Sequence, residues 1–372
     1  MSSTARRRRA GVAIAMGSGL ALVLSACGGG ESDSGSEPSA LDSNADLTKQ
    51  TVVVSNWKDY MPKDIAARVK KASGANVKVT YHATNEDMVA KVTGSGGAGL
   101  DVVFGSQPFL QAFAEEGLLE PIDTAQVPNW DNLDAKAAEL AKVDGQTFWA
   151  PYSWGTTGIC YRSDLVDEAP DSWNDLLAPD DKYKGKVTMM GTERWAVLPA
   201  QKALGYSVNT TDEAEMAKVK DLMVKAKPNL LAYDDTTFYE RLVSGEAVMT
   251  QAWDGWCNYG TAENPKIKFA VPKEGSDLWT DNMAILKSSK NKEAAYAFIN
   301  TVLDAKTHAW VEENILYNIP NEAALDSIPG KLTRQFDTLG TRRQEMLDGE
   351  NMKDVGDAAS LYNKIITDVT AS

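Results

Sequence analysis

The feature that most constrains this fold is an alternation of short apolar runs with amphipathic segments, which begins at Thr51. Residues 52–54, 77–81 and 100–104 predict strands, and residues 86–92 between them predict a helix. Strands this apolar are typical of a sheet covered on both faces, and their alternation with helices indicates βαβ units. The sequence therefore predicts an α/β fold class.

A second series of the same kind follows, and the body after Thr51 has about 320 residues, long enough for two core-forming lobes. A helix ends at Leu204 and another covers residues 293–303, with Ala294, Ala297 and Phe298 on one side. The predicted strands of this series are residues 158–161, 187–190, 247–253, 269–271 and 283–286.

The amino terminus indicates export. Arg6–Arg9 form a basic region, residues 11–24 form an apolar one, and Leu24-Ser25-Ala26-Cys27 resembles the lipobox of bacterial lipoproteins. We expect residues 1–26 to be a signal peptide, cut before Cys27, whose lipid would hold the chain at the extracytoplasmic face of the cell membrane. An ordinary signal peptide and an uncleaved anchor are the alternatives, and the export route, Sec or twin-arginine, stays open.

Residues 27–50 are predicted to be a flexible linker. Gly28, Gly29 and Gly30 open it, and residues 32–44 have almost nothing apolar, so they gain little by ordering. No apolar run of transmembrane length follows. The predicted mature protein is a soluble body on a lipid tether.

The net charge limits which partners the chain can bind, and the cysteine content limits its possible disulfides. The formal charge of -14 becomes -18 when the four arginines of residues 1–26 are removed, which argues against nucleic acid and anionic lipid. The acidity suits a cationic ligand. Once Cys27 is lipidated, Cys160 and Cys257 remain, either as a disulfide in an oxidising compartment or as two buried thiols.

Aromatic and acidic residues gather where predicted strands end, which is where ligands bind in open parallel sheets. A tryptophan in such a loop that caps the core is the alternative for any single one. Several together favour a binding site. Trp57 and Tyr60 follow the first strand, Ser106 follows the third, Trp253, Asp254 and Trp256 follow the strand at 247–253, and Trp279 and Asp281 precede the strand at 283–286.

These residues lie in motifs that resemble the spermidine/putrescine-binding proteins of bacterial polyamine ABC transporters. The resemblance runs from about Thr51 to the carboxyl terminus. Its motifs are Asn56-Trp57-Lys58-Asp59-Tyr60, Thr84-Asn85-Glu86, Leu100-Asp101-Val102-Val103, Pro151-Tyr152-Ser153-Trp154-Gly155-Thr156-Thr157, Ser172-Trp173-Asn174-Asp175-Leu176, Pro272-Lys273-Glu274-Gly275 and Asp354-Val355-Gly356.

The resemblance implies a two-lobed periplasmic-binding-protein fold, type II, with two crossing hinge strands. Lobe 1 would comprise residues 51–156 plus 280–325, and lobe 2 residues 157–279 plus 326–372. A small amine would bind in the cleft between the lobes, and closure would present the loaded protein to an ABC permease. We expect a monomer.

The same resemblance assigns roles to individual residues. Asp281 would receive a terminal ammonium group, because a desolvated cation needs a fixed anion. Asp59 and Asp254 are not among the positions carried over, but they are nearby acids and are our candidates for the second ammonium group, with a solvated surface position as the alternative for each. The ligand-lining positions carried over are Trp57, Tyr60, Ser106, Trp253, Trp279, Asp281 and Tyr317.

The chain departs from the family where spermidine binders hold their far amines. Pro108 replaces a frequent cleft tyrosine, Thr192 and Trp195 replace two acids, and Met352 replaces a glutamine. Glu193, beside Thr192, is a candidate substitute. The departures favour a shorter diamine such as putrescine, or a monoamine with a bulky end, over spermidine.

Two other functional classes, an anion-binding protein and an enzyme, are less well supported. An anion binder would need arginines at the strand ends, where Lys58 is the one cation. An enzyme would need a nucleophile elbow, a metal cluster or a phosphate loop, and the sequence shows none. His82 and His308 read as ordinary residues, so we expect no catalysis, cofactor or metal. Another small cationic or zwitterionic solute is the alternative ligand.

Overall fold

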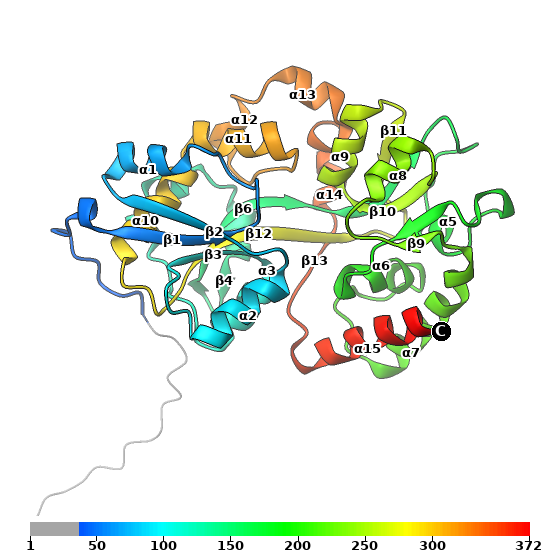
Figure 1. The fold of residues 1–372 in the computed structure, drawn as a ribbon, viewed down its shortest axis with the longest axis horizontal. Helices are drawn as coiled ribbons and strands as arrows, with labels where there is room; N and C mark the ends of the chain where they lie inside the picture. The colour runs from blue at the N-terminus through cyan, green and yellow to red at the C-terminus, as the bar shows by residue number, and fades with distance from the viewer. Residues whose placement is uncertain (1–36) are drawn as a thin grey trace, which may run out of the picture. The chain divides into compact units, whose positions relative to one another are not determined.

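The computed structural model describes residues 37–372 (Figure 1). The predicted signal peptide, Cys27 and the linker up to residue 36 lie outside the described residues. Within the described part, two sheets form two lobes, and each sheet has helices packed on it. The predicted α/β class is confirmed.

The first sheet has six strands in the order β13-β12-β3-β1-β2, with β6 also paired to β12. The predicted parallel pairing is present, since β1 lies between β2 and β3 and runs parallel to both. Val52, Val54 and Val102 are fully buried. They share a core cluster with residues of α1 and α10. The strands are β1 (Thr51–Asn56), β2 (Asn76–Tyr81), β3 (Val102–Ser106), β6 (Trp149–Gly155), β12 (Asp277–Ile285) and β13 (Glu350–Asn351).

The second sheet has the order β11-β7-β10-β8-β9. Helices α6, α7 and α15 share one core cluster with β8, and α8 and α9 share another with β11, so the sheet is covered on both faces. Its strands are β7 (Thr157–Arg162), β8 (Val187–Met189), β9 (Ala232–Tyr233), β10 (Met249–Trp253) and β11 (Ile267–Ala270). Outside both sheets, β4 (Lys142–Val143) pairs with β5 (Gln146–Thr147).

The helices follow the predicted amphipathic segments, with additions. Those of the first lobe include α1 (Ile65–Ser73), α2 (Asn85–Ser95), α3 (Gln107–Glu115), α4 (Ala135–Leu140), α10 (Lys292–Val302), α11 (Ala305–Ile315) and α12 (Glu322–Leu325). The others are α5 (Asn174–Leu177), α6 (Glu193–Ala203), α7 (Glu213–Ala226), α8 (Phe238–Ser244), α9 (Asp254–Glu263), α13 (Gly330–Gln335), α14 (Arg343–Leu347) and α15 (Ala359–Ala371). Helix α1 begins after Asp64.

Two antiparallel strands, β6 and β12, connect the lobes (Figure 1). They pair from Trp149 opposite Ala284 to Gly155 opposite Trp279, and β6 leads through Thr156 directly into β7 of the second sheet. Both strands are buried along their whole length. They are the two crossing strands that the resemblance implied.

The sequence misplaced the start of β12. Trp279 and Asp281 were expected to precede a strand at 283–286, but β12 begins at Asp277, so both lie within it. The polar residues of this stretch hide its strand character, which comes from pairing with β3 and β6. Pro151 hid β6 in the same way, and it lies opposite Asn282, where the register shifts and a missing N–H is tolerated.

Part of the predicted flexible linker contacts the first lobe. The backbone N–H of Ser39 donates to Glu120 Oε1 at 2.6 Å, and that of Asp42 donates to Glu293 Oε1 at 3.1 Å. Lys292 Nζ also donates to Ser39 Oγ at 2.7 Å. Residues 37–50 therefore have attachments that their polar composition alone did not predict.

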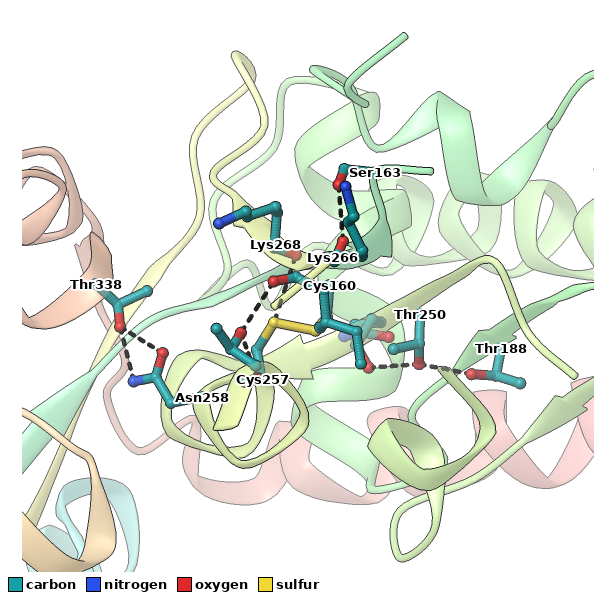
Figure 2. The surroundings of a disulfide bond; sticks show 12 residues. Cys160, Ser163, Thr188, Thr250, Cys257, Asn258, Lys266, Lys268 and Thr338 are labelled. Carbon is teal, nitrogen blue, oxygen red and sulfur yellow. Dashed lines mark hydrogen bonds between the residues drawn. A yellow bond between two sulfur atoms is a disulfide. The ribbon is translucent and has the colours of Figure 1, made fainter. Parts of the chain in front are cut away.

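Cys160 and Cys257 are joined by a disulfide with an S–S distance of 2.01 Å (Figure 2). Cys160 lies in β7 and Cys257 in α9, and the two are separated by 97 residues along the chain. A link across a loop of this length stabilises a fold by about 4.7 kcal/mol in the chain-entropy model. The bond fixes α9, the helix that begins at Asp254, against the strand that follows β6.

Candidate ligand-binding site

Asp281 on β12 is the centre of the candidate site. Its Oδ1 accepts a hydrogen bond from Ser106 Oγ at 2.7 Å, and its Oδ2 accepts one from Tyr60 OH at 2.7 Å. The Tyr60 hydroxyl also lies 3.0 Å from Ser153 Oγ on β6. Residues from β3, β6 and the loop after β1 therefore converge on one carboxylate, as the strand register requires, because Asp281 lies opposite both serines.

A further set of contacts holds this cluster in place. Asn85 Oδ1 accepts a hydrogen bond from the Ser106 amide at 3.0 Å, and the Tyr152 hydroxyl donates to the Tyr60 carbonyl oxygen. His308 Nε2 lies 2.6 Å from the Tyr152 carbonyl oxygen, and burial lowers the pKa of His308 to about 4. A neutral imidazole that donates to a carbonyl is a structural residue, in agreement with the role expected for His308.

The electrostatic state of Asp281 is unusual for a buried acid. Its side chain is 8% exposed, and no Lys, Arg or His of residues 37–372 forms an ion pair with it. Burial raises the pKa of Asp281 to about 6, against the lowering effect of the hydrogen bonds from Ser106 and Tyr60. An isolated buried carboxylate is costly, so the site favours the arrival of a cation.

Aromatic rings surround this carboxylate. Tyr60 lies at the middle, with ring centroids 5.3 Å from Trp57 and 6.4 Å from Tyr317, and Tyr317 in turn lies 5.0 Å from Trp279. Trp253 belongs to the second lobe, where its ring lies 5.5 Å from that of Trp195. An ammonium group over such ring faces gains about 0.5–2 kcal/mol per contact. Four of the predicted aromatic residues, Trp57, Tyr60, Trp279 and Tyr317, are therefore brought together beside Asp281.

Two glycines allow Asp254 to approach the same cluster. A Cβ atom on Gly155 would lie 2.2 Å from Asp254 Oδ1 and 2.3 Å from Cζ2 of Trp279. A Cβ atom on Gly255 would lie 2.4 Å from Cε1 of Tyr317. Asp254 is therefore packed against the aromatic wall of the site, fully buried, and the alternative of a solvated surface position for it is wrong.

Asp277 is a further buried acid beside the site that the sequence reasoning missed. Its Oδ1 accepts a hydrogen bond from the Thr157 amide at 2.8 Å, and its Oδ2 accepts one from Trp195 Nε1 at 3.0 Å. The signal was present in the sequence, because Asp277, Trp279 and Asp281 alternate with a period of two, as residues on one face of a strand do. It was overlooked because this stretch was not recognised as a strand.

The remaining predicted residues do not join the cluster in the same way. Asp59 is exposed, in a left-handed conformation with φ 59°. Glu193 is the first residue of α6, and its side chain lies outside those that the structure describes. Trp195 is buried and packs edge-on against Trp253 at 5.5 Å, so it does not present a free face to a bulky ligand.

A cavity of about 210 Å³ is lined by Trp154, Leu278 and Thr280, which belong to the opposite face of the crossing strands from Asp281. Ser153, whose hydroxyl lies 3.0 Å from that of Tyr60, also lines it, so the cavity borders the Asp281 cluster at β6. In the part of the chain from residue 37 onward, no group of three or more His, Cys, Asp and Glu residues is placed to hold a metal ion. The helices of that part include none that is long and apolar enough to cross a membrane.

Comparison with known proteins agrees with this geometry. Residues 64–331 match the family of bacterial extracellular solute-binding proteins. The spermidine/putrescine-binding periplasmic protein of Escherichia coli K12 is 30% identical over 315 residues, which cover 84% of this chain and 90% of the relative. The putrescine-binding periplasmic protein PotF of the same organism is 30% identical over 294 residues, covering 74% and 79% of the two chains.

Among solved structures, a putative spermidine/putrescine ABC transporter protein from Listeria monocytogenes superposes with a TM-score of 0.77 at 28% identity. The match covers 86% of this chain and 99% of that one. The two-lobed fold is thus the periplasmic-binding-protein fold, type II, and the chain belongs to the bacterial extracellular solute-binding proteins.

Proposed function

We propose that this chain is the substrate-binding component of an ABC importer and captures a small cationic amine of the putrescine or spermidine class. The observation that carries the proposal is Asp281, a buried carboxylate held by two hydroxyl donors, walled by aromatic rings and without an ion-pair partner among the described residues. Relatives with polyamine names at 30% identity support the same ligand class.

In this proposal each residue acts on a different part of the ligand. Asp281 accepts hydrogen bonds from the ammonium group and neutralises its charge. Trp57, Trp253 and Trp279 cover the methylene groups and offer ring faces to the cation. Tyr317 accepts a further hydrogen bond from an amine. The net charge of -18 expected for the mature chain raises the local concentration of cationic ligands.

A zwitterionic ligand is less well supported by the same residues. It needs a cation for its carboxylate. The buried Arg194 already donates from Nη1 to the Lys353 carbonyl at 2.7 Å and from Nη2 to the Val208 carbonyl at 3.1 Å, which leaves Nε as its donor without a partner. Lys58 is exposed. The charge pattern therefore favours a purely cationic amine.

Delivery to a permease requires the lobes to close over the ligand. We place the lobe boundaries at the crossing strands, with 51–156 plus 280–325 in lobe 1 and 157–279 plus 326–372 in lobe 2. A lipid on Cys27 would keep a monomer near its permease at the membrane. A Cys27→Ser chain should appear in the soluble fraction or medium; retention in washed membranes equal to that of the unsubstituted chain would contradict the anchor.

The proposed function is tested by isothermal titration calorimetry with putrescine, cadaverine, spermidine and n-butylamine, and with succinate as an anionic control. Amines should bind and succinate should not. Asp281→Asn should weaken amine binding by about 1.5–3 kcal/mol, and Asp181→Asn, which alters an exposed pair with Lys184, should change nothing. Absence of binding by every amine, or equal binding by Asp281→Asn, would contradict the proposal.

A further inference from the structure

Asp254 and Asp277 form a second pair of buried acids next to the Asp281 site. Both are fully buried. Two successive backbone amides hold them, because the Thr156 N–H donates to Asp254 Oδ1 at 3.1 Å and the Thr157 N–H donates to Asp277 Oδ1 at 2.8 Å. Because these two amides belong to successive residues, the two carboxyl groups that they hold lie close together.

This pair has no cation of its own. Among residues 37–372, no Lys, Arg or His lies within ion-pair distance of either carboxyl group. The charge of Arg194 acts on Asp277 from a longer distance, while its Nη atoms donate to carbonyl oxygens and its Nε has no acceptor. Asp254 Oδ2 is a buried acceptor without a hydrogen-bond partner in the described part of the chain. Buried acceptors are normally satisfied, so this atom points to a missing donor.

The pKa values of the pair are shifted in the same direction as that of Asp281. Burial raises the pKa of Asp254 well above its usual value, and the charge of Asp277 raises it further. Burial raises the pKa of Asp277 as well, against hydrogen bonds from Thr157, Ser276 and Trp195. A bound cation would offset the repulsion that otherwise favours a proton at this place.

The pair stands at a defined distance from Asp281. Ser153, which joins the Asp281 cluster, and Gly155, which faces Asp254, are two residues apart on β6. Two residues of extended strand span roughly 7 Å. The Trp279 indole lies between, since its Cζ2 edge approaches Gly155 from the same side as Asp254. Asp281, the Trp279 indole and the pair of Asp254 and Asp277 therefore follow one another along the shared face of β6 and β12.

We infer that Asp254 and Asp277 form a second ammonium subsite, so that the ligand is a short alkyl diamine with one cation at Asp281, its methylene groups on Trp279 and its other cation at this pair. The inference rests on the proposed function and narrows it. It assigns Asp277, which Trp195 and Thr157 orient, as a specificity-determining residue. The subsite takes over the role of the far acids that Thr192 and Trp195 replace.

The test compares putrescine with n-butylamine, which has the same carbon chain and only one ammonium group. Asp254→Asn should weaken putrescine binding roughly tenfold to hundredfold and leave n-butylamine binding within twofold, which also shows that the variant is folded. Asp277→Asn should lower the ratio of putrescine to n-butylamine affinity in the same direction. Asp181→Asn, at an exposed acid of the second lobe that pairs with Lys184, is the control and should change neither ligand.

The outcomes separate the two proposals. Equal binding of putrescine and n-butylamine to the unsubstituted chain, or an equal effect of Asp254→Asn on both, would overturn the second subsite and leave the proposed function standing. Failure of every amine to bind the unsubstituted chain would overturn both.

Discussion

Buried acids of this protein fall into two groups, those within the lobes and those between them. Within the lobes, Glu120 receives Lys292 Nζ at 2.6 Å and Asp234 receives Arg241 Nε at 2.7 Å. Between the lobes, Asp254, Asp277 and Asp281 have hydrogen-bond donors but no ion-pair partner among the described residues. The fold supplies a cation to Glu120 and Asp234 and none to the three acids between the lobes. Asp101, also buried within the first lobe, is held instead by hydrogen bonds from the Val53 amide, Ser289 and Asn291.

The pKa values follow this division. Burial alone would raise the pKa of Glu120 and of Asp234, but hydrogen bonds that include those from Lys292 and Arg241 lower both below their usual values. Burial raises the pKa of all three acids between the lobes. Glu312 is intermediate, because burial raises its pKa to about 7 although Arg343 lies 3.3 Å away. We therefore expect a buried acid between the lobes that has no ion-pair partner to bind a cation that arrives from solution.

The largest expected effect is on the free energy of unfolding, and it should come from removing the cation that pairs with a buried acid within a lobe. Lys292→Met leaves the Glu120 carboxylate, 3% exposed, without its cation and should lower the free energy of unfolding by about 2–3 kcal/mol. Chemical denaturation measures it. Lys142→Met, which removes the exposed partner of Glu139, is the control, with an expected change below about 0.5 kcal/mol. Equal effects from the two variants would remove the distinction between buried and surface pairs.

Replacing an acid between the lobes by a neutral amide should change the free energy of unfolding in the opposite direction. At pH 7.5 the ligand-free chain carries a buried charge at Asp281, and Asp281→Asn should therefore raise the free energy of unfolding by about 1–2 kcal/mol. The same denaturation experiment, without ligand, measures the change. A loss of stability comparable to that of Lys292→Met would mean that Asp281 is a structural acid like Glu120.

The smallest effect is on the pH dependence of binding. Because burial raises the pKa of Asp281 to about 6, the carboxyl group is mostly protonated at pH 5 and must release its proton to bind an ammonium group. Amine affinity should therefore rise about tenfold between pH 5 and pH 7.5 and then level off. The raised pKa also means that the ligand-free protein loses this part of its stability as pH rises from about 4 to about 6.

The tyrosines around Asp281 do not titrate in this pH range, whereas Asp254 and Asp277, whose pKa values burial also raises, change the affinity in the same direction as Asp281. Tyr60, Tyr152 and Tyr317 have pKa values raised well above 10 and stay protonated. Titration calorimetry at the two pH values measures the change. A flat profile across this range, or an affinity that falls as pH rises, would be inconsistent with Asp281 as the anchor.

The sequence predicted the parts of this fold that depend on local pattern. The apolar runs at 52–54 and 77–81 became β1 and β2, and Trp57, Tyr60 and Asp281 were assigned to one site by resemblance before the structure brought them together. Local composition sufficed for these strands because each buries its apolar residues within one sheet.

The parts that depend on distant pairing were not predictable. β6 contains Pro151 and the first half of β12 is largely polar, so neither resembles a strand until the other lies beside it. Asp277 was missed for the same reason. The contacts of Ser39 with Glu120 and Lys292 likewise join residues far apart in sequence, which composition cannot anticipate.

The central claim, that acids left without a built-in cation receive one from the ligand, is tested most directly by a crystal structure of the chain with putrescine. One nitrogen should lie within about 2.7–3.2 Å of an Asp281 carboxylate oxygen, with the other beside Asp254 and Asp277. An occupied site in which no ligand nitrogen contacts any of these three carboxyl groups would contradict it.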